Sequence, residues 1–227
     1  MTSRAVPSRN GGPVVVEMWT DLGCPWCYVG KHRLQNAIGT RPDAARFVIR
    51  LRSFELNPGA PKVPEAIADA FLRSHGGTPD TVLRAERRIQ GLALSEGLPF
   101  SLDRLNANTF DVHRVLHYAE AEGPGLAFFS LVQDRFFAGE LNPFDQDELA
   151  AAAEAAGLPG RRVREVLASR EYAAAVRADR EEGAALGVTG VPFTVFDRQL
   201  AAAGALSTAA YRDALDQVAP VAAAERS

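Results

Sequence analysis

A chain of 227 residues can bury a large core, either as one domain or as one domain with a substantial insertion. Its 47% hydrophobic and 23% charged residues are ordinary for a globular protein, and a net charge of −3 argues against a nucleic-acid partner. No apolar run is long enough for a signal peptide or a membrane span, so we expect a cytoplasmic protein with no membrane partner. Because the cytoplasm keeps thiols reduced, the only two cysteines are expected to be catalytic.

The first predicted elements flank those two cysteines. The apolar run at residues 14–19 predicts a buried strand, and residues 25–38 predict a helix. Pro25 suits the first turn of a helix, where its missing N–H costs nothing. Four residues then recur at helical spacing on one face: Cys27, Gly30, Leu34 and Ile38. Cys24 is therefore expected at the mouth of the helix, with Cys27 one turn in beneath it.

This placement favours redox chemistry. The free N–H groups and the dipole of a helix N-terminus favour the thiolate, which is the nucleophilic form of cysteine. Cys24 is thus the predicted nucleophile, and Cys27 is placed to resolve a mixed disulfide on Cys24. Two alternatives are half of a zinc site and an inert structural disulfide. The first would need a second cysteine pair, which the chain lacks, and the second would close too short a loop to stabilise the fold.

The rest of the chain predicts a long helical segment between two groups of strands. Residues 47–52 alternate between apolar and polar side chains, which predicts a second strand parallel to the first. Residues 58–186 carry only helical signatures, with expected helices at 65–74, 79–96, from 109 onward, around 128–136, and at 146–156, 161–169 and 171–186. A strand at 193–196, its hairpin partner at 199–203 and a helix from Ser207 to about Val218 complete the chain.

This order of elements predicts an α/β protein with a thioredoxin fold, in which a large all-helical domain is inserted between the βαβ and ββα halves. We expect a discontinuous thioredoxin-like domain at residues 13–57 and 187–220 and a helical insertion at residues 58–186. Residues 1–12 and 221–227 are predicted to be mobile tails.

Several motifs resemble those of one known family. The segment from Cys24 to Gly30, Cys-Pro-Trp-Cys-Tyr-Val-Gly, is similar to that of the DsbA-like thioredoxin superfamily, most closely its FrnE-like branch of cytoplasmic oxidoreductases. Matches in family order continue at residues 54–58, 108–109, 113–114, 136–140 and 187–193. The resemblance implies a thiol–disulfide oxidoreductase acting on protein or low-molecular-weight disulfides and dithiols. It implies no bound cofactor, because the redox-active Cys24–Cys27 disulfide carries the electrons, with glutathione as a possible recycling reductant.

The resemblance also assigns roles around the cysteines. The Val191–Pro192 bond would be trans if this proline simply started a strand, but the family pattern implies a cis bond facing Cys24. The backbone of Val191 would then pair with an extended substrate. Pro25 and Trp26 are further expected substrate contacts, the alternative for Trp26 being plain surface exposure.

Two histidines and three acids complete the candidates. His113 and His117 lie four residues apart, a metal-ligand spacing, but we expect no metal site and place His113, at a family position, in the cleft between the domains. The acids form a separate group that could cap the turn or accept the proton of Cys27: Glu17, Asp21 and Glu55.

Two other functions stay open on the sequence alone. Glutathione-dependent transferases and 2-hydroxychromene-2-carboxylate isomerases share the inserted architecture, but they generally carry serine in place of Cys24 and lack the second cysteine. A zinc-binding, non-enzymatic module is the third hypothesis.

Overall fold

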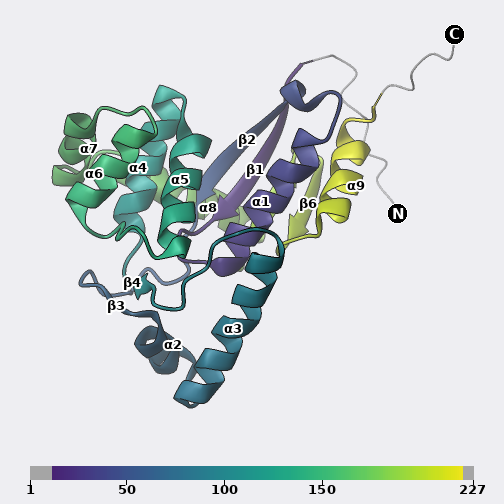
Figure 1. Ribbon diagram of the computed structural model, residues 1–227. Coiled ribbons are helices and arrows are strands. Elements are labelled where there is room, and N and C mark those ends of the chain that lie inside the picture. Colours follow the sequence, from purple (N-terminus) through teal and green to yellow (C-terminus); the bar gives the residue numbers. More distant parts are fainter. Residues whose placement is uncertain (1–11, 222–227) are drawn as a thin grey trace, which may run out of the picture.

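A four-stranded sheet forms the centre of the computed structural model, which describes residues 12–221 (Figure 1). The strands lie in the order β2-β1-β5-β6, with bounds β1 Val14–Thr20, β2 Phe47–Ser53, β5 Phe193–Phe196 and β6 Leu200–Ala203. β2 is parallel to β1, whereas β5 and β6 run antiparallel to their neighbours. This is the predicted thioredoxin fold. The predicted mobile tails fall outside the described residues, apart from residues 12 and 221.

Two helices cover one face of the sheet. α1 (Pro25–Gly39) packs side by side with α9 (Thr208–Val218), and a short 3-10 helix, η1 (Ala44–Arg46), leads from α1 into β2 (Figure 1). The four residues predicted on the inner face of α1 are all buried: Cys27, Gly30, Leu34 and Ile38. Side chains alternate along a strand, so Met18 and Thr194, which are register partners, share the face that α1 and α9 cover.

The helix α8 covers the opposite face of the sheet (Figure 1). Here Trp19 donates its indole N–H to the backbone carbonyl of Asp179, with 2.8 Å between Nε1 and O. The carboxylate of Asp179 accepts from the backbone N–H of Ser53 at 2.7 Å. A Cβ at Gly183 would lie 2.8 Å from Trp19 Nε1, so the glycine lets α8 approach the sheet this closely.

The chain between β2 and β5 is mostly helical. Its helices are α2 (Ile67–His75), α3 (Pro79–Ser95), α4 (Phe110–Glu122), α5 (Gly125–Ala138), α6 (Gln146–Ala155), α7 (Gly160–Ala168) and α8 (Ala173–Ala185). α4 to α7 pack as a bundle beside the sheet, whereas α2 and α3 project together from the end of the sheet where α1 begins (Figure 1). Within residues 12–221, no helix combines the length and the apolar character that crossing a bilayer requires.

Two details of this insertion differ from the prediction. The insertion is not all-helical, because β3 (Glu65–Ala66) and β4 (Leu105–Asn106) form a short antiparallel pair. The helix predicted from residue 65 therefore begins at Ile67, whose N–H donates to the carbonyl of Arg104 at 3.0 Å. The helix predicted from residue 171 begins at Ala173, because Tyr172 adopts a left-handed backbone with φ 59°.

Candidate active site

The first turn of α1 brings the two cysteines together. Cys24 is the N-cap residue of α1, with an extended backbone (φ −81°, ψ 113°), and Pro25 occupies the first turn, as predicted. The sulfur of Cys24 accepts a hydrogen bond from the backbone N–H of Cys27, with 3.4 Å between Sγ and N. Both cysteines are free thiols. A helix N-terminus therefore points one of its unpaired N–H groups at the sulfur of Cys24, which stabilises negative charge there.

The loop before β5 closes the other side of Cys24. The Cys24 thiol lies 3.6 Å from the carbonyl oxygen of Val191, to which it donates, and the Val191–Pro192 peptide bond is cis. Both observations agree with the prediction. A Cβ at Gly30 would lie 3.1 Å from Cγ of Pro192, so any side chain at this position would crowd the loop on which α1 packs. This contact explains the last residue of the Cys24–Gly30 motif, to which we gave no role from the sequence.

The second thiol has a different environment. Cys27 is fully buried, and this burial raises its pKa well above the usual value because the thiolate would lose its hydration. The neighbouring Cys24 raises the pKa of Cys27 further, whereas hydrogen bonds with the backbone of Asp21 and with the hydroxyl of Thr20 lower it. Cys27 is thus held as a neutral thiol beneath Cys24.

The acids considered as proton acceptors for Cys27 are engaged elsewhere. Glu17 lies on the face of β1 that meets α8, opposite α1, and forms ion pairs with Arg52 and Arg198. Burial alone would raise the pKa of Glu17, but hydrogen bonds from the two arginines hold it below its usual value. Glu55 accepts a hydrogen bond from the side chain of Asn108, with 3.2 Å between Oε1 and Nδ2. Neither contact directs these carboxylates toward the thiol of Cys27.

Asp21 anchors the turn that precedes Cys24. Its Oδ2 accepts from the backbone N–H of Leu56 at 2.8 Å, and its Oδ1 lies 3.3 Å from Nε2 of His113. Gln133, which is also buried, donates from Nε2 to the carbonyl oxygen of Leu22 at 3.3 Å. Two helices of the insertion, α4 and α5, therefore hold the turn that carries the nucleophile.

The predicted place of His113 in the cleft is wrong. Its side chain is fully buried, stacks on the ring of Phe129 and points at Asp21, because the face of α4 that carries it packs against α5. His117 contacts a different carboxylate, with 3.0 Å between its Nε2 and Oδ2 of Asp179. Among residues 12–221, no three His, Cys, Asp or Glu side chains are grouped as a metal site would require.

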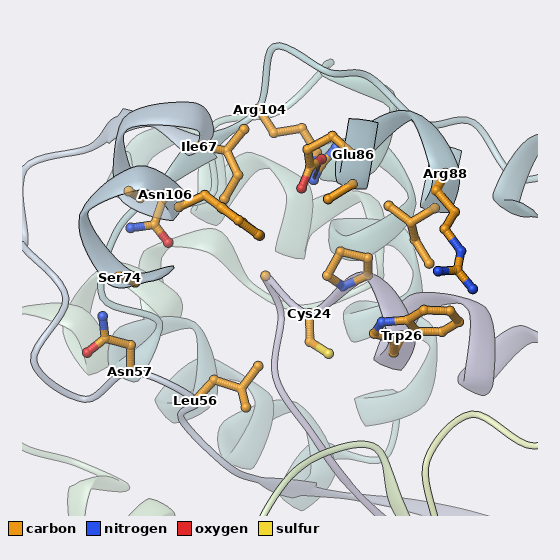
Figure 2. A pocket seen from close by; sticks show the side chains of 16 residues that line it. Cys24, Trp26, Leu56, Asn57, Ile67, Ser74, Glu86, Arg88, Arg104 and Asn106 are labelled. Atoms are coloured by element: carbon orange, nitrogen blue, oxygen red, sulfur yellow. Dashed lines mark hydrogen bonds and ion pairs between the residues drawn. The ribbon is translucent and has the colours of Figure 1, made fainter. Parts of the chain in front are cut away.

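A cavity of about 530 Å³ opens beside Cys24 (Figure 2). Its walls come from the start of α1, from α2 and α3, and from the segments around Leu56 and Asn106. Pro25 and Trp26, which we expected to contact substrate, line this cavity, and Trp26 is 46% exposed at its edge. Val191 and Pro192 contact or flank the thiol but do not line this cavity, whose position depends on α2 and α3.

A sheet of this order, a Cys-x-x-Cys pair at the start of the helix after β1, and a cis-proline loop facing the first cysteine define a thioredoxin-fold protein with a redox-capable thiol pair. Residues 15–216 match the model of the DSBA-like thioredoxin domain, and the chain belongs to this family.

Solved structures agree with this assignment. The chain is 37% identical to a probable DsbA oxidoreductase of Streptomyces coelicolor, over 90% of this chain and 89% of that one, with a TM-score of 0.85. It shares the fold of a 2-hydroxychromene-2-carboxylate isomerase (18% identity, 84% and 88% coverage, TM-score 0.64). It also shares the fold of a cytosolic disulfide reductase of Pseudomonas aeruginosa in a structure with GSH (18% identity, 89% and 94% coverage, TM-score 0.57).

Proposed function

We propose that this chain is a thiol–disulfide oxidoreductase in which Cys24 is the nucleophile and Cys27 the resolving thiol. The observation that carries the proposal is the asymmetry of the pair. Cys24 caps α1 and lines an open cavity, whereas Cys27 is fully buried one turn below, with a raised pKa. Only the first thiol is placed to meet a substrate, and only the second is held in reserve behind it.

In the reductive direction, the thiolate of Cys24 attacks one sulfur of a substrate disulfide and displaces the other as a thiolate. A mixed disulfide then joins Cys24 to the remaining half of the substrate. Cys27 gives up its proton and attacks Sγ of Cys24, which releases the second substrate thiol and leaves the Cys24–Cys27 disulfide. Two electrons pass from the protein to the substrate, and the same steps in reverse oxidise a dithiol.

The surrounding groups support each step. The N–H of Cys27 stabilises charge on the sulfur of Cys24, and Val191 and Pro192 form a wall against which a substrate sulfur can be held. Pro25 and Trp26 add apolar contact at the edge of the cavity. No bound cofactor is needed, since the cysteine pair itself carries the electrons.

The finer assignment is to the FrnE-like branch, working in the cytoplasm on protein or low-molecular-weight disulfides, with glutathione as the recycling reductant. Two observations support it: the Cys24–Gly30 motif, and the likeness of the fold to a cytosolic disulfide reductase whose structure was determined with GSH.

The experiment uses two single variants of the full chain. Cys27→Ser should accumulate mixed disulfides with 2-hydroxyethyl disulfide, seen as an added mass of one half of the probe, because resolution is blocked. Cys24→Ser should accumulate none, because Cys27 is buried. Reduced wild-type protein should instead become the intramolecular disulfide and release both thiol halves. Equal trapping by the two variants, or none by Cys27→Ser, would refute the assignment of the nucleophile.

A glutathione-dependent isomerase is a second candidate, favoured by the fold it shares with 2-hydroxychromene-2-carboxylate isomerase and by the apolar cavity at the start of α1. An isomerisation needs no resolving thiol, so the Cys27→Ser variant of an isomerase would keep its full catalytic activity. If Cys27→Ser instead loses catalytic turnover, the oxidoreductase is favoured over the isomerase.

A further inference from the structure

The cavity beside Cys24 is shaped for a small apolar group. At about 530 Å³ it is within the ~300–1,000 Å³ usual for small-molecule sites. Most of its wall is apolar, built from side chains that include Trp26, Ile67, Phe71 and Ile89. Cys24 is only 4% exposed and lines this cavity, so a group attached to an attacked sulfur would find apolar surface directly beside the thiol.

The charged groups of the cavity divide into one satisfied pair and one unpaired cation. Glu86 and Arg104 are both buried and bonded to each other, with 2.7 Å between Oε2 and Nη2, so this pair neutralises itself in the wall. Arg88 differs, since it is exposed and has no ion-pair or hydrogen-bond partner within residues 12–221. Figure 2 shows Arg88 on the same side of the cavity as Trp26, above the thiol of Cys24.

We propose that the cavity binds small organic disulfides that combine an apolar, preferably aromatic, body with an anionic group, and that Arg88 binds the anion. This inference rests on the proposed function and names a substrate class for it. The apolar half of the disulfide lies against Trp26 and the walls of α2 and α3, with its sulfur at Cys24. Attack by the Cys24 thiolate joins this half to the protein and releases the other half as a thiolate. Cys27 then attacks Sγ of Cys24 and displaces the bound apolar half as a thiol.

The two parts of the site have separate energetic roles. Burial of an aromatic ring against apolar walls contributes most of the affinity, because it removes apolar surface from water. Arg88 is exposed, so its attraction for an anion is screened by solvent and contributes less. Arg88 therefore selects among apolar disulfides rather than replacing the apolar contact.

The test measures how fast reduced protein reacts with three disulfides in single-turnover stopped-flow experiments. 5,5′-Dithiobis(2-nitrobenzoate) is aromatic and anionic, 4,4′-dithiodipyridine is aromatic and neutral, and 2-hydroxyethyl disulfide is neither. The reaction with 2-hydroxyethyl disulfide serves as the internal reference for the reactivity of Cys24. The effect of each variant on an aromatic probe is divided by its effect on this reference, which removes any change that the variant causes in the reactivity of Cys24 itself.

Ala85→Trp should fill the cavity, because Ala85 lies on the exposed side of α3 and lines it. We expect this variant to react with both aromatic disulfides about tenfold more slowly relative to the reference, a loss of ~1.4 kcal/mol of apolar contact. Leu83→Trp is the control, since Leu83 is exposed on the same helix but lies outside the cavity. It should leave all three rates unchanged.

Arg88→Gln tests the anion contact, with Arg87→Gln as its matched control. Both substitutions remove one exposed positive charge from α3, but only Arg88 lines the cavity. Arg88→Gln should slow the dianionic probe about fivefold and leave 4,4′-dithiodipyridine unchanged, whereas Arg87→Gln should alter neither.

The outcomes separate this inference from the proposed function. If no disulfide oxidises the Cys24–Cys27 pair, the proposed function fails. If all three react but Ala85→Trp slows them equally or not at all, the apolar site is refuted while the oxidoreductase stands. If Arg88→Gln and Arg87→Gln behave alike, the role of Arg88 in anion binding is refuted.

Discussion

Cys24 at the N-cap of α1, Cys27 and Gly30 follow one another along the inner side of this helix, yet their surroundings differ. At the N-cap, Cys24 borders a cavity and a carbonyl oxygen. One turn on, Cys27 is sealed in the core, and at the next level Gly30 is pressed against Pro192. The comparison teaches that the helix N-terminus distinguishes the two thiols only in part, by directing an N–H group at the sulfur of Cys24. The other difference is the segment that each residue contacts, which is a cavity and a carbonyl oxygen for Cys24 and the closed core for Cys27.

The position of Cys24 depends on the helical insertion, because the insertion holds the turn that precedes this residue. Removing a contact of this kind has the largest expected effect on stability. Replacing His113 with Ala removes the buried partner of Asp21 and leaves a cavity against Phe129. We expect a loss of about 2–4 kcal/mol in the free energy of unfolding, because Oδ1 of Asp21 loses its partner, although Oδ2 keeps the N–H of Leu56, and because packing against Phe129 is lost. Disulfide exchange should slow as well, because Asp21 anchors the turn before Cys24. Urea unfolding and single-turnover exchange measure the two effects.

His117→Ala is the control for this substitution. His117 is on the same helix and also faces a carboxylate, but Asp179 keeps its bonds to Arg52 and Ser53 without it. The variant should therefore lose less stability than His113→Ala and keep its exchange rate. Equal losses in the two variants would mean that the Asp21–His113 contact has no special part in holding the turn.

The sequence predicts the surroundings of some of these residues and not of others. Pro25 and the spacing of apolar residues predict α1 and the inward position of Cys27, because these are local properties of one helix. The cis bond at Pro192 and its place beside Cys24 come from the family resemblance, since no local pattern brings residues 24 and 191 together. His113 shows the limit most clearly: its helix was predicted, but which element its face would meet depends on how α4 packs against α5.

The cavity was beyond sequence analysis for the same reason. Its walls require α2 and α3 to project beside the start of α1, and that arrangement begins at the β3–β4 pair. Two-residue strands leave no periodic pattern that a sequence window could detect. Gly30 did carry a signal, because a glycine inside a helix costs about 1 kcal/mol relative to alanine and invites a packing explanation.

The burial of Cys27 predicts that the stability of the protein depends on pH. Burial raises the pKa of Cys27 in the folded protein, whereas an unfolded cysteine titrates near ~8.5. Below about pH 8.5 both states hold the proton, so this contribution to stability is fully present. Above it the unfolded chain loses the proton first, and stability falls by about 1.4 kcal/mol per pH unit until the folded pKa is reached.

The measurement is urea unfolding of the reduced protein at several pH values from neutral to alkaline, compared with Cys27→Ala. The comparison is necessary because burial of Lys31 lowers its pKa to about 8, which makes stability rise with pH over part of the same range. That contribution cancels in the difference between the two proteins. Parallel curves for the wild type and Cys27→Ala would show that Cys27 is not held neutral by the fold.

Substitution of Gly30 has the smallest expected effect on stability and tests the contact between α1 and the loop before β5. A Cβ at Gly30 would lie 3.1 Å from Pro192 Cγ and 3.3 Å from Ala205 Cβ, so Gly30→Ala must push one of them away by a few tenths of an ångström. At Gly39, the last residue of α1, no neighbouring atom lies within 4 Å of the added Cβ. Alanine is the better helix former at both positions, by up to about 1 kcal/mol in a helix interior.

Gly39→Ala should therefore be neutral or slightly stabilising, whereas in Gly30→Ala the cost of crowding, typically ~1–3 kcal/mol, should outweigh the gain in helix propensity. We expect the free energy of unfolding of Gly30→Ala to fall about 1 kcal/mol below that of Gly39→Ala. Adding Ala205→Gly removes one of the two crowded contacts, so it should cost less stability in the Gly30→Ala background than in the wild type. If it costs the same in both, or if Gly30→Ala is as stable as Gly39→Ala, then the packing of α1 against Pro192 tolerates a side chain and the glycine is not needed for the close approach.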